Sequence, residues 1–326
     1  MYLEYYLPEK IVTNAEIAKE FPEWDYLEFE KNVGIKSRHI AQENETALDL
    51  AEKASLKLFQ NVDKSSIDFI LLCTQSPDYF LPTSACILQS RLNLSTSCGA
   101  LDFNLGCSGF IYGLALAKSL FLSNIASNIL LVMAETYSKH VYPKDKANRI
   151  IFGDGAAATL INENNFSIGE FVLGTDGNGF QKLIIKNGGL RNKHVSDVKE
   201  FVYGTGNITT DNHLFMNGLE IFSFTMTTIP NLIKQTAEKN KLSMSEIDFF
   251  IFHQANEYML NYLRTKTKIP QEKFCIDLIE TGNTVSVTIP IALKNSYLKN
   301  QIKRGDKVML VGFGVGLSWG ATVITI

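Results

Sequence analysis

The stretch KSSIDFILLC at Lys64–Cys73 returns in a weaker form as MSEIDFFIFH at 244–253. Two more segments recur in the same order: LDFNLGC at 101–107 and NILLVMAE at 128–135 return as IDLIETGN at 276–283 and KVMLVGFG at 307–314. Solenoid repeats have periods of about 20–50 residues, so a recurrence over about half the chain indicates duplication of a whole domain. The sequence therefore predicts two related halves.

The apolar segments of this repeat have the length and composition of buried strands. Runs such as FILLC, ILLVM, FFIFH and VMLVGF are short and apolar throughout, as in strands covered on both faces. Between them, apolar residues recur at helical spacing in four longer segments, 47–59, 109–123, 219–239 and 288–302. This alternation predicts an α/β protein with mainly parallel sheets, and two copies of the unit place helices between two sheets.

We place the boundary between an N-terminal half, 1–165, and a C-terminal half, 166–326, because the polar run at 162–165 interrupts the apolar pattern there. The stretch from Asn187 to Asp211 is polar and glycine-rich. It predicts a long surface insertion in the second half.

Composition narrows the class of protein. The chain has 326 residues, a net charge of -3 and 45% hydrophobic residues, as expected for a globular protein with a sizeable core. It has no basic stripe for nucleic acid, and no apolar run approaches the roughly 20 residues that span a bilayer. The five cysteines are odd in number and lack metal-ligand spacing. We therefore expect a cytoplasmic protein with neither a disulfide framework nor a metal site.

Cys107 is the first candidate for chemistry. It stands between a strand-like run and a helix-like run and is flanked by Gly106 and Gly109. This pattern predicts a tight turn that places the sulfur at a helix N-terminus. The positive end of the helix and its free N–H groups favour the thiolate, which lowers the thiol pKa and creates a nucleophile. The alternative is an inert cysteine that fills the core as a small apolar residue.

His253 and Asn283 are the candidates in the second half. His253 follows the apolar run 249–252, at a strand end where the sites of α/β proteins collect, and Asn283 lies in a TGNT turn. Their structural alternatives are a hydrogen-bonded core histidine and a turn-capping asparagine. The duplication maps the turn of Asn283 onto that of Cys107, and His253 onto the strand end at Cys73. We therefore expect the thiol, imidazole and amide to share one pocket.

Five motifs surround these residues in a fixed order: GCSGFIYGLALA (106–117), FGDGAAATLI (152–161), FHQAN (252–256), TGNTVSVTIPIAL (281–293) and GFGVGLSWGATVI (312–324). Together with LPEKIVTNAEIA and VGIKSRHIA near the N-terminus, they resemble the β-ketoacyl-acyl-carrier-protein synthase III family over essentially the whole chain. The resemblance implies a thiolase fold, in which two duplicated α/β halves form a layered αβαβα sandwich. It also implies a homodimer and a catalytic triad of Cys107, His253 and Asn283.

The reaction implied by the resemblance is a decarboxylative Claisen condensation. Cys107 attacks an acyl thioester and becomes acylated. Malonyl-acyl carrier protein then loses carbon dioxide while His253 and Asn283 donate hydrogen bonds to the enolate. The carbanion attacks the acyl group, and the backbone N–H groups of Cys107 and Val315 hold the oxyanion. The substrates are thioesters of coenzyme A or of acyl carrier protein, and no resident cofactor or metal is implied.

Further residues are assigned from the resemblance one by one. Substrate contacts fall to Leu81, Phe152, Ala255, Asn256 and Lys146. Leu81 matches the position that reaches across the dimer and closes the partner's acyl pocket.

Two departures from the family pattern concern the acyl donor. Bacterial relatives clamp the adenine of coenzyme A between a tryptophan and an arginine, and the matching positions here are Glu28 and Lys146. The arginine that docks carrier protein after HQAN is replaced by Tyr258. We therefore assign carrier docking to a basic run, Arg264, Lys266 and Lys268. The departures favour an acyl group delivered by a carrier protein or by an unusual coenzyme A thioester.

Two other functions fit the same residues. One is an acyltransferase that passes the acyl group from Cys107 to an alcohol or amine without decarboxylation; relatives with that chemistry tend to change the asparagine. The other is a non-catalytic partner subunit with the thiolase fold, and such subunits usually lose the cysteine or histidine. The retained Cys107, His253 and Asn283 favour condensation.

Overall fold

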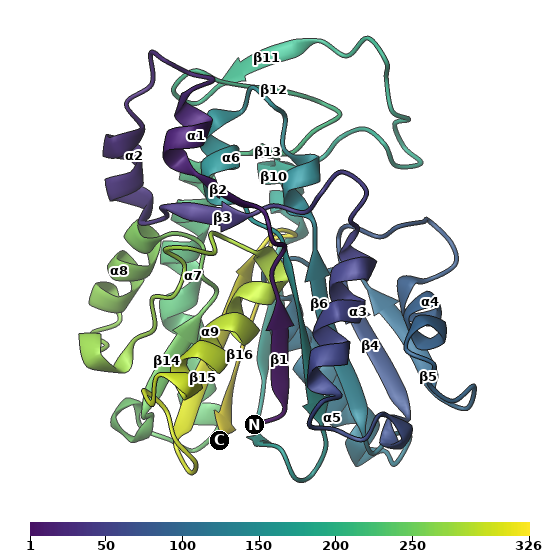
Figure 1. The fold of residues 1–326 in the computed structure, drawn as a ribbon. Coiled ribbons are helices and arrows are strands. Elements are labelled where there is room, and N and C mark those ends of the chain that lie inside the picture. Colours follow the sequence, from purple (N-terminus) through teal and green to yellow (C-terminus); the bar gives the residue numbers. More distant parts are fainter.

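In the computed structural model, which describes residues 1–326, the chain forms two five-stranded sheets with helices between and outside them (Figure 1). The first sheet has the order β1-β7-β6-β4-β5, with β1 (Leu3–Tyr6), β4 (Phe69–Cys73), β5 (Gly99–Phe103), β6 (Ile129–Glu135) and β7 (Gly155–Ile161). In the second sheet, β14 (Phe249–Phe252), β15 (Lys307–Gly314) and β16 (Ser318–Thr325) lie in that order, and β16 also pairs with β8 (Ser167–Ile168) and β9 (Val172–Thr175).

The chain has nine α-helices: α1 (Asn14–Ala18), α2 (Tyr26–Val33), α3 (Ala47–Leu58), α4 (Ser84–Arg91), α5 (Gly109–Leu122), α6 (Lys146–Ile151), α7 (Gly218–Lys239), α8 (Glu257–Lys266) and α9 (Thr288–Leu298). Three small antiparallel pairs complete the fold: β2 (Ile11–Thr13) with β3 (Ser37–His39), β10 (Leu183–Ile184) with β13 (Phe215–Met216), and β11 (Glu200–Tyr203) with β12 (Asn207–Thr210).

The internal repeat corresponds to a structural repeat. β4 runs parallel to β6, which is antiparallel to β7, and the same relations hold among β14, β15 and β16. The aspartate shared by the two copies also has the same task. The Asp68 carboxylate accepts a hydrogen bond from the backbone N–H of Asn128 at 3.0 Å, and that of Asp248 accepts one from Lys307 at 2.8 Å. Each aspartate fixes the start of the neighbouring strand.

The layers follow from which face each helix covers. α5 and α9 lie between the sheets, and their apolar side chains form one core with β4, β6, β14 and β15. α3 and α4 pack on the outer face of the first sheet around a second core, and α7 and α8 cover the second sheet around a third. This arrangement is an αβαβα sandwich, although both sheets are mixed and not mainly parallel as the sequence predicted.

The first sheet takes its strands from residues 3–161 and the second from 167–325, so we keep the proposed boundary near residue 165. The packing crosses this boundary. Val33, Ile35 and Ile150 of the N-terminal half belong to the third core, with α7 and α8. The two halves therefore share their interior at the end of the molecule where the candidate residues lie.

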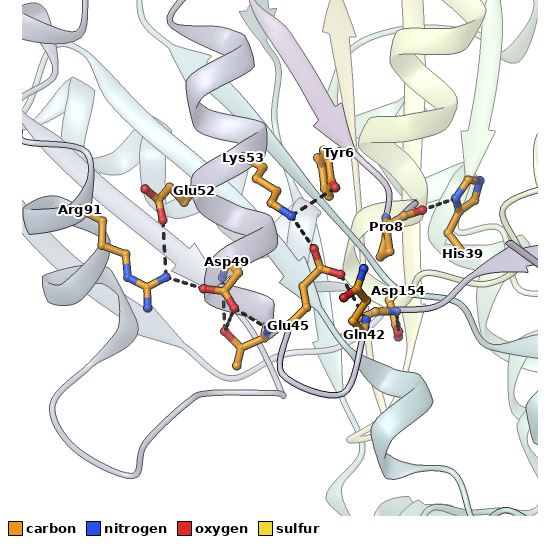
Figure 2. A network of polar contacts seen from close by, with 12 residues as sticks. Tyr6, Pro8, His39, Gln42, Glu45, Asp49, Glu52, Lys53, Arg91 and Asp154 are labelled. Carbon is orange, nitrogen blue, oxygen red and sulfur yellow. Dashed lines mark hydrogen bonds and ion pairs between the residues drawn. The ribbon is translucent and has the colours of Figure 1, made fainter. Parts of the chain in front are cut away.

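Ion pairs fasten the outer helices of the first half (Figure 2). Arg91, at the end of α4, lies 2.6 Å from the carboxylate of Asp49 in α3. Lys53, on the same helix, lies 2.6 Å from Glu45 and also donates to the Tyr6 hydroxyl of β1. These contacts are partly exposed, so each contributes at most about 1 kcal/mol to stability.

None of the helices combines the length and the apolar character that crossing a bilayer requires.

Candidate active site

Cys107 lies in the turn that leads from β5 into α5, with Ser108 as the residue before the first helical position. Cys107 is 7% exposed and faces β15 of the second sheet. Gly314, at the end of β15, lies directly against it: a Cβ at this position would be 2.9 Å from Sγ. The helix N-terminus predicted from the sequence is present, and the second half supplies the opposite wall.

The expected thiolate is not the resting state. Burial raises the pKa of the Cys107 thiol to about 12, and the nearby carboxyl of Glu135 adds to this rise. Hydrogen bonds from the backbone N–H groups of Cys107 and Val315 lower the pKa, but less than burial raises it. The prediction of a lowered pKa was therefore wrong, because desolvation outweighs the helix terminus. The two N–H donors expected to hold the oxyanion do face the sulfur.

His253 follows β14 and is 2% exposed. Burial lowers the pKa of its imidazole to about 3, so the ring is neutral. Its Nδ1 lies 2.8 Å from the hydroxyl of Thr288, which also lies 3.0 Å from the carbonyl oxygen of Val285. The hydroxyl has one hydrogen. When it points to the carbonyl, Nδ1 carries the ring proton and Nε2 can accept; when it points to Nδ1, Nε2 can donate.

Asn283 is held by the backbone of the other half. Its N–H donates to the carbonyl of Ile151 at 2.8 Å, and its carbonyl accepts from the N–H of Gly153 at 3.1 Å. The side-chain oxygen accepts from the N–H of Val285 at 2.9 Å, which leaves the amide NH2 free to donate. Val285 has a φ of 57°, a left-handed conformation that is costly for a β-branched residue.

One cavity of about 140 Å³ joins these groups. Cys107, His253 and Asn283 all line it, as do three of the expected substrate contacts, Phe152, Ala255 and Asn256. Sequence reasoning missed most of the apolar lining, which comes from both halves: Tyr137, Ile151, Leu183, Met216, Ile221, Met259 and Phe313. Phe313 lies inside a recognised motif and Ile151 directly precedes one, so their place in the sequence was the signal that could have identified them.

The other assigned residues lie outside the cavity. Leu81 is 82% exposed in the loop before α4. Arg264 and Lys266 occupy the last turn of α8 and Lys268 follows it, at the opposite end of the helix from Asn256. The ammonium of Lys266 donates to the carbonyl of Met226, so it is not a free surface charge.

Lys146 begins α6, and its Nζ lies 5.9 Å from the ring centre of Trp24. The sequence comparison placed Glu28 in the position of the adenine-binding tryptophan, but Glu28 lies on α2 and an indole occupies the space beside Lys146. Trp24 therefore supplies an aromatic face beside Lys146 that the family pattern did not indicate.

A buried thiol, a neutral imidazole and a free amide meet here at the seam of two duplicated α/β halves. This combination defines a class, the acyl-transferring enzymes that use a cysteine nucleophile.

Comparisons with known proteins give the family. The family model described as 3-oxoacyl-[acyl-carrier-protein (ACP)] synthase III matches residues 101–177, and its C-terminal counterpart matches 237–326. Beta-ketoacyl-[acyl-carrier-protein] synthase III of Clostridium perfringens is 37% identical, over 98% of this chain and 96% of its own. The protein of the same name from Caldanaerobacter subterraneus is 36% identical, over 98% and 95%.

Solved structures agree. A crystal structure of a 3-oxoacyl-(acyl-carrier-protein) synthase III has a TM-score of 0.97 and 44% identity, covering 99% of this chain and 98% of that one. The corresponding enzyme of Thermus thermophilus has a TM-score of 0.87 and 33% identity, with coverage of 99% and 98%. The chain belongs to the β-ketoacyl-[acyl-carrier-protein] synthase III family. Its fold is the thiolase fold that the motifs implied.

Proposed function

We propose that the protein is an acyltransferase of the 3-oxoacyl-[acyl-carrier-protein] synthase III type, which condenses an acyl thioester with malonyl-acyl carrier protein through an acyl-cysteine. The observation that carries this proposal is the free amide of Asn283 beside neutral His253 in the cavity of Cys107. Two neutral donors suit an enolate, because they stabilise its charge without losing a proton to it.

The first half-reaction needs a base, because the Cys107 thiol has a raised pKa. His253 can serve while Thr288 donates to the Val285 carbonyl, since Nε2 then holds a lone pair. Because burial makes His253 too weak a base to deprotonate the free thiol beforehand, the proton moves from sulfur to Nε2 as the sulfur attacks the acyl carbonyl. The proton then passes to the departing thiolate. The N–H groups of Cys107 and Val315 are the proposed oxyanion donors, because both already face the sulfur.

The second half-reaction uses His253 as a donor. With the Thr288 hydrogen turned toward Nδ1, the ring proton sits on Nε2 and joins the Asn283 amide in holding the malonyl thioester oxygen. Loss of carbon dioxide leaves an enolate, whose α-carbon attacks the acyl group on Cys107. The tetrahedral oxyanion then collapses and expels the Cys107 thiolate, which takes a proton from water to restore the thiol, and the product is a β-ketoacyl thioester. No resident cofactor enters these steps, because the substrates bring their own thioesters.

The acyl donor is proposed to be a coenzyme A thioester. Trp24 offers a planar face and Lys146 a cation beside it, a pair suited to an adenine and its neighbouring phosphates. For the carrier protein we retain Arg264, Lys266 and Lys268 as docking residues, although the Lys266 ammonium already has a partner. We place the enzyme in the cytoplasm, since its five free cysteines suit a reducing compartment.

We also propose a homodimer. β5 is an edge strand with no partner on its outer side (Figure 1), and Leu101 on it is 45% exposed. The loop before α4 presents Tyr79, Phe80 and Leu81 to solvent at 61%, 86% and 82%. An open edge and large exposed apolar side chains are features that pairing with a second copy would cover. Leu81 is then free to reach the partner's cavity.

Asn283→Asp tests the proposed function. The wild-type enzyme should acquire an acyl mass on Cys107 from acyl-CoA and then release carbon dioxide from malonyl-acyl carrier protein. The variant should still be acylated, because Asn283 acts in the second step, while carbon dioxide release falls roughly 100-fold through loss of an enolate donor. Asn300→Asp, exposed at the end of α9, adds the same charge as a control.

The measurement is mass spectrometry of the Cys107 peptide combined with trapping of labelled carbon dioxide. If the acyl group passes to an alcohol or amine and no carbon dioxide is released, the protein forms an ester or amide and does not catalyse condensation. A Cys107 that is never acylated would mark a partner subunit without catalytic activity.

A further inference from the structure

A buried carboxyl that plays no part in the proposed steps lies behind the nucleophile. Glu135 ends β6 and is completely buried. Its two oxygens accept from the backbone N–H of Gln75 at 3.2 and 3.1 Å, from the hydroxyl of Ser76 at 3.2 Å and from that of Ser286 at 3.1 Å. No cation pairs with it. Burying a carboxyl costs free energy unless it is hydrogen-bonded, and Gln75, Ser76 and Ser286 supply those hydrogen bonds here.

The bond to Ser286 differs from the other two. Gln75 and Ser76 belong to the same half as Glu135, whereas Ser286 lies in the second half, in the short turn Val285–Val287 that leads into α9. Ser286 is 1% exposed. It stands three residues after Asn283 and two before Thr288, the residue that contacts the ring of His253. The Glu135–Ser286 hydrogen bond therefore crosses the seam beside both enolate donors.

The charge of Glu135 matters because of what surrounds it. The titratable groups near the carboxyl are Cys73 on β4, Cys107 on its turn, Tyr137 and Asp154, and His140 reaches it through Ser76. None of them supplies a positive charge at neutral pH, since burial also lowers the pKa of His140. Burial raises the pKa of Glu135 to about 8, so it is a neutral acid below that pH. In this form one carboxyl oxygen carries the proton and donates to a serine hydroxyl while the other accepts, so the group links its partners without placing a negative charge behind the sulfur.

We propose that Glu135 is a positioning residue for the condensation: acting through Ser286, it holds the segment that carries Asn283 against the turn that carries Cys107. The inference rests on the proposed function, because it assigns the residue to the second half-reaction. It differs from a general structural role, which would affect both half-reactions alike.

Ser286→Ala, Glu135→Gln and the double variant test the proposal. Ser286→Ala removes one hydroxyl and should lower carbon dioxide release at least tenfold, while acylation of Cys107 changes less than threefold. Glu135→Gln keeps the shape and one acceptor oxygen, so it should fall between this variant and the wild type. The double variant should be no slower than the slower single variant, because the two residues act through one bond. Thermal unfolding of each variant confirms that it is folded.

Ser76→Ala is the matched control. It removes a hydrogen bond of 3.2 Å to the same carboxyl, against 3.1 Å for that of Ser286, but from the first half, so both half-reactions should stay within threefold of the wild type. The pH profile gives a second readout. Ionisation of Glu135 adds a negative charge near the sulfur and the enolate, so wild-type condensation should decline as pH rises through about 8. Glu135→Gln should lack this decline.

Equal losses in acylation and condensation, or additive losses in the double variant, would overturn the role of Glu135. The wild-type enzyme distinguishes this result from a failure of the proposed function. If it is acylated but releases no carbon dioxide, the condensation itself is refuted and the positioning role with it. If it condenses normally and Ser286→Ala does too, only the role of Glu135 is lost.

Discussion

At the scale of single residues, Cys107 shows how two environmental effects on one thiol compete. The helix N-terminus and the N–H group of Val315 favour the thiolate, but a site that is almost dry disfavours it more. The resting enzyme therefore holds a protonated sulfur, and a substrate together with His253 must complete its activation. Such a thiol is protected from oxidants and alkylating agents until it is used.

This protection predicts an unusual pH dependence. Because the pKa of Cys107 is raised to about 12, the thiolate fraction increases about tenfold with each unit by which the pH rises toward that value. Alkylation by iodoacetamide should therefore rise steadily from pH 7 to pH 10 with no plateau, as measured by mass spectrometry of the Cys107 peptide. The exposed Cys86 reports reagent activity in the same digest. A plateau below pH 9 would indicate an ion pair between Cys107 and His253.

Gly314 is a second position where one added atom, a Cβ, should change the reactivity of Cys107. A Cβ there would lie 2.8 Å from Cβ of Cys107 and 2.9 Å from its Sγ, so Gly314→Ala must push the nucleophile aside. Displacement of a reacting group by about 1 Å costs on the order of 100-fold in rate, and we expect that loss in the acylation rate of Cys107. Gly177→Ala is the control, since its Cβ meets no atom within 4 Å. Equal rates for both variants would contradict the tight contact.

At the scale of elements, the regular parts of the chain were predictable from local patterns. The helical spacings at 47–59 and 109–123 correspond to α3 and α5 to within one residue, because both helices bury a continuous apolar face. The fourth predicted helix extends four residues too far. α9 ends at Leu298, where the chain turns through Asn300 with a left-handed φ of 55°.

Elements that depend on distant partners were not predictable in this way. The polar stretch from Asn187 to Asp211 is a surface insertion as expected, but it contains β11 and β12. This hairpin docks on α6 through the Tyr203 hydroxyl, which donates to Asp145 at 2.6 Å. Neither residue carries a local signal for that bond. The mixed strand directions were missed for the same reason, since apolar runs give no information on pairing partners.

α3 offers a test of local stability. Thr46 caps this helix, accepting from the N–H of Asp49 while the Asp49 carboxylate accepts from the N–H of Thr46. Thr46→Ala should lower the free energy of unfolding by about 1 kcal/mol in a urea titration. Activity should be unchanged, because α3 covers the outer face of the first sheet. Thr96→Ala, exposed in a loop, serves as the control, and equal midpoints for the two variants would count against the capping box.

At the scale of the whole molecule, the site exists because two copies of one unit face each other. The repeat in the sequence was sufficient to place Cys107, His253 and Asn283 in one cavity, since corresponding strand ends converge. It was not sufficient for the pKa of the sulfur, for Trp24 beside Lys146, or for Glu135. Those features depend on burial and on contacts between segments far apart in the chain.

The proposed dimer makes a prediction at this scale. Leu101→Asp places a charge on the open edge of β5 and should shift the protein from dimer to monomer in sedimentation equilibrium, with a parallel loss of activity. Leu298→Asp, which changes a leucine that is 62% exposed at the end of α9, should remain dimeric. A wild-type protein that sediments as a monomer would refute the pairing, and Leu81 would then have no neighbouring cavity to enter.

At Val285, a strained backbone that lowers stability is combined with a side chain that fills the core. Its backbone conformation costs roughly 1–3 kcal/mol for a branched side chain, yet it lies wholly inside the core between Asn283 and Ser286. Glycine would relieve that strain, but it has no side chain to fill the core and would make the turn that carries Asn283 more flexible. Evolution for heat resistance and evolution for turnover should therefore favour different residues at this one position.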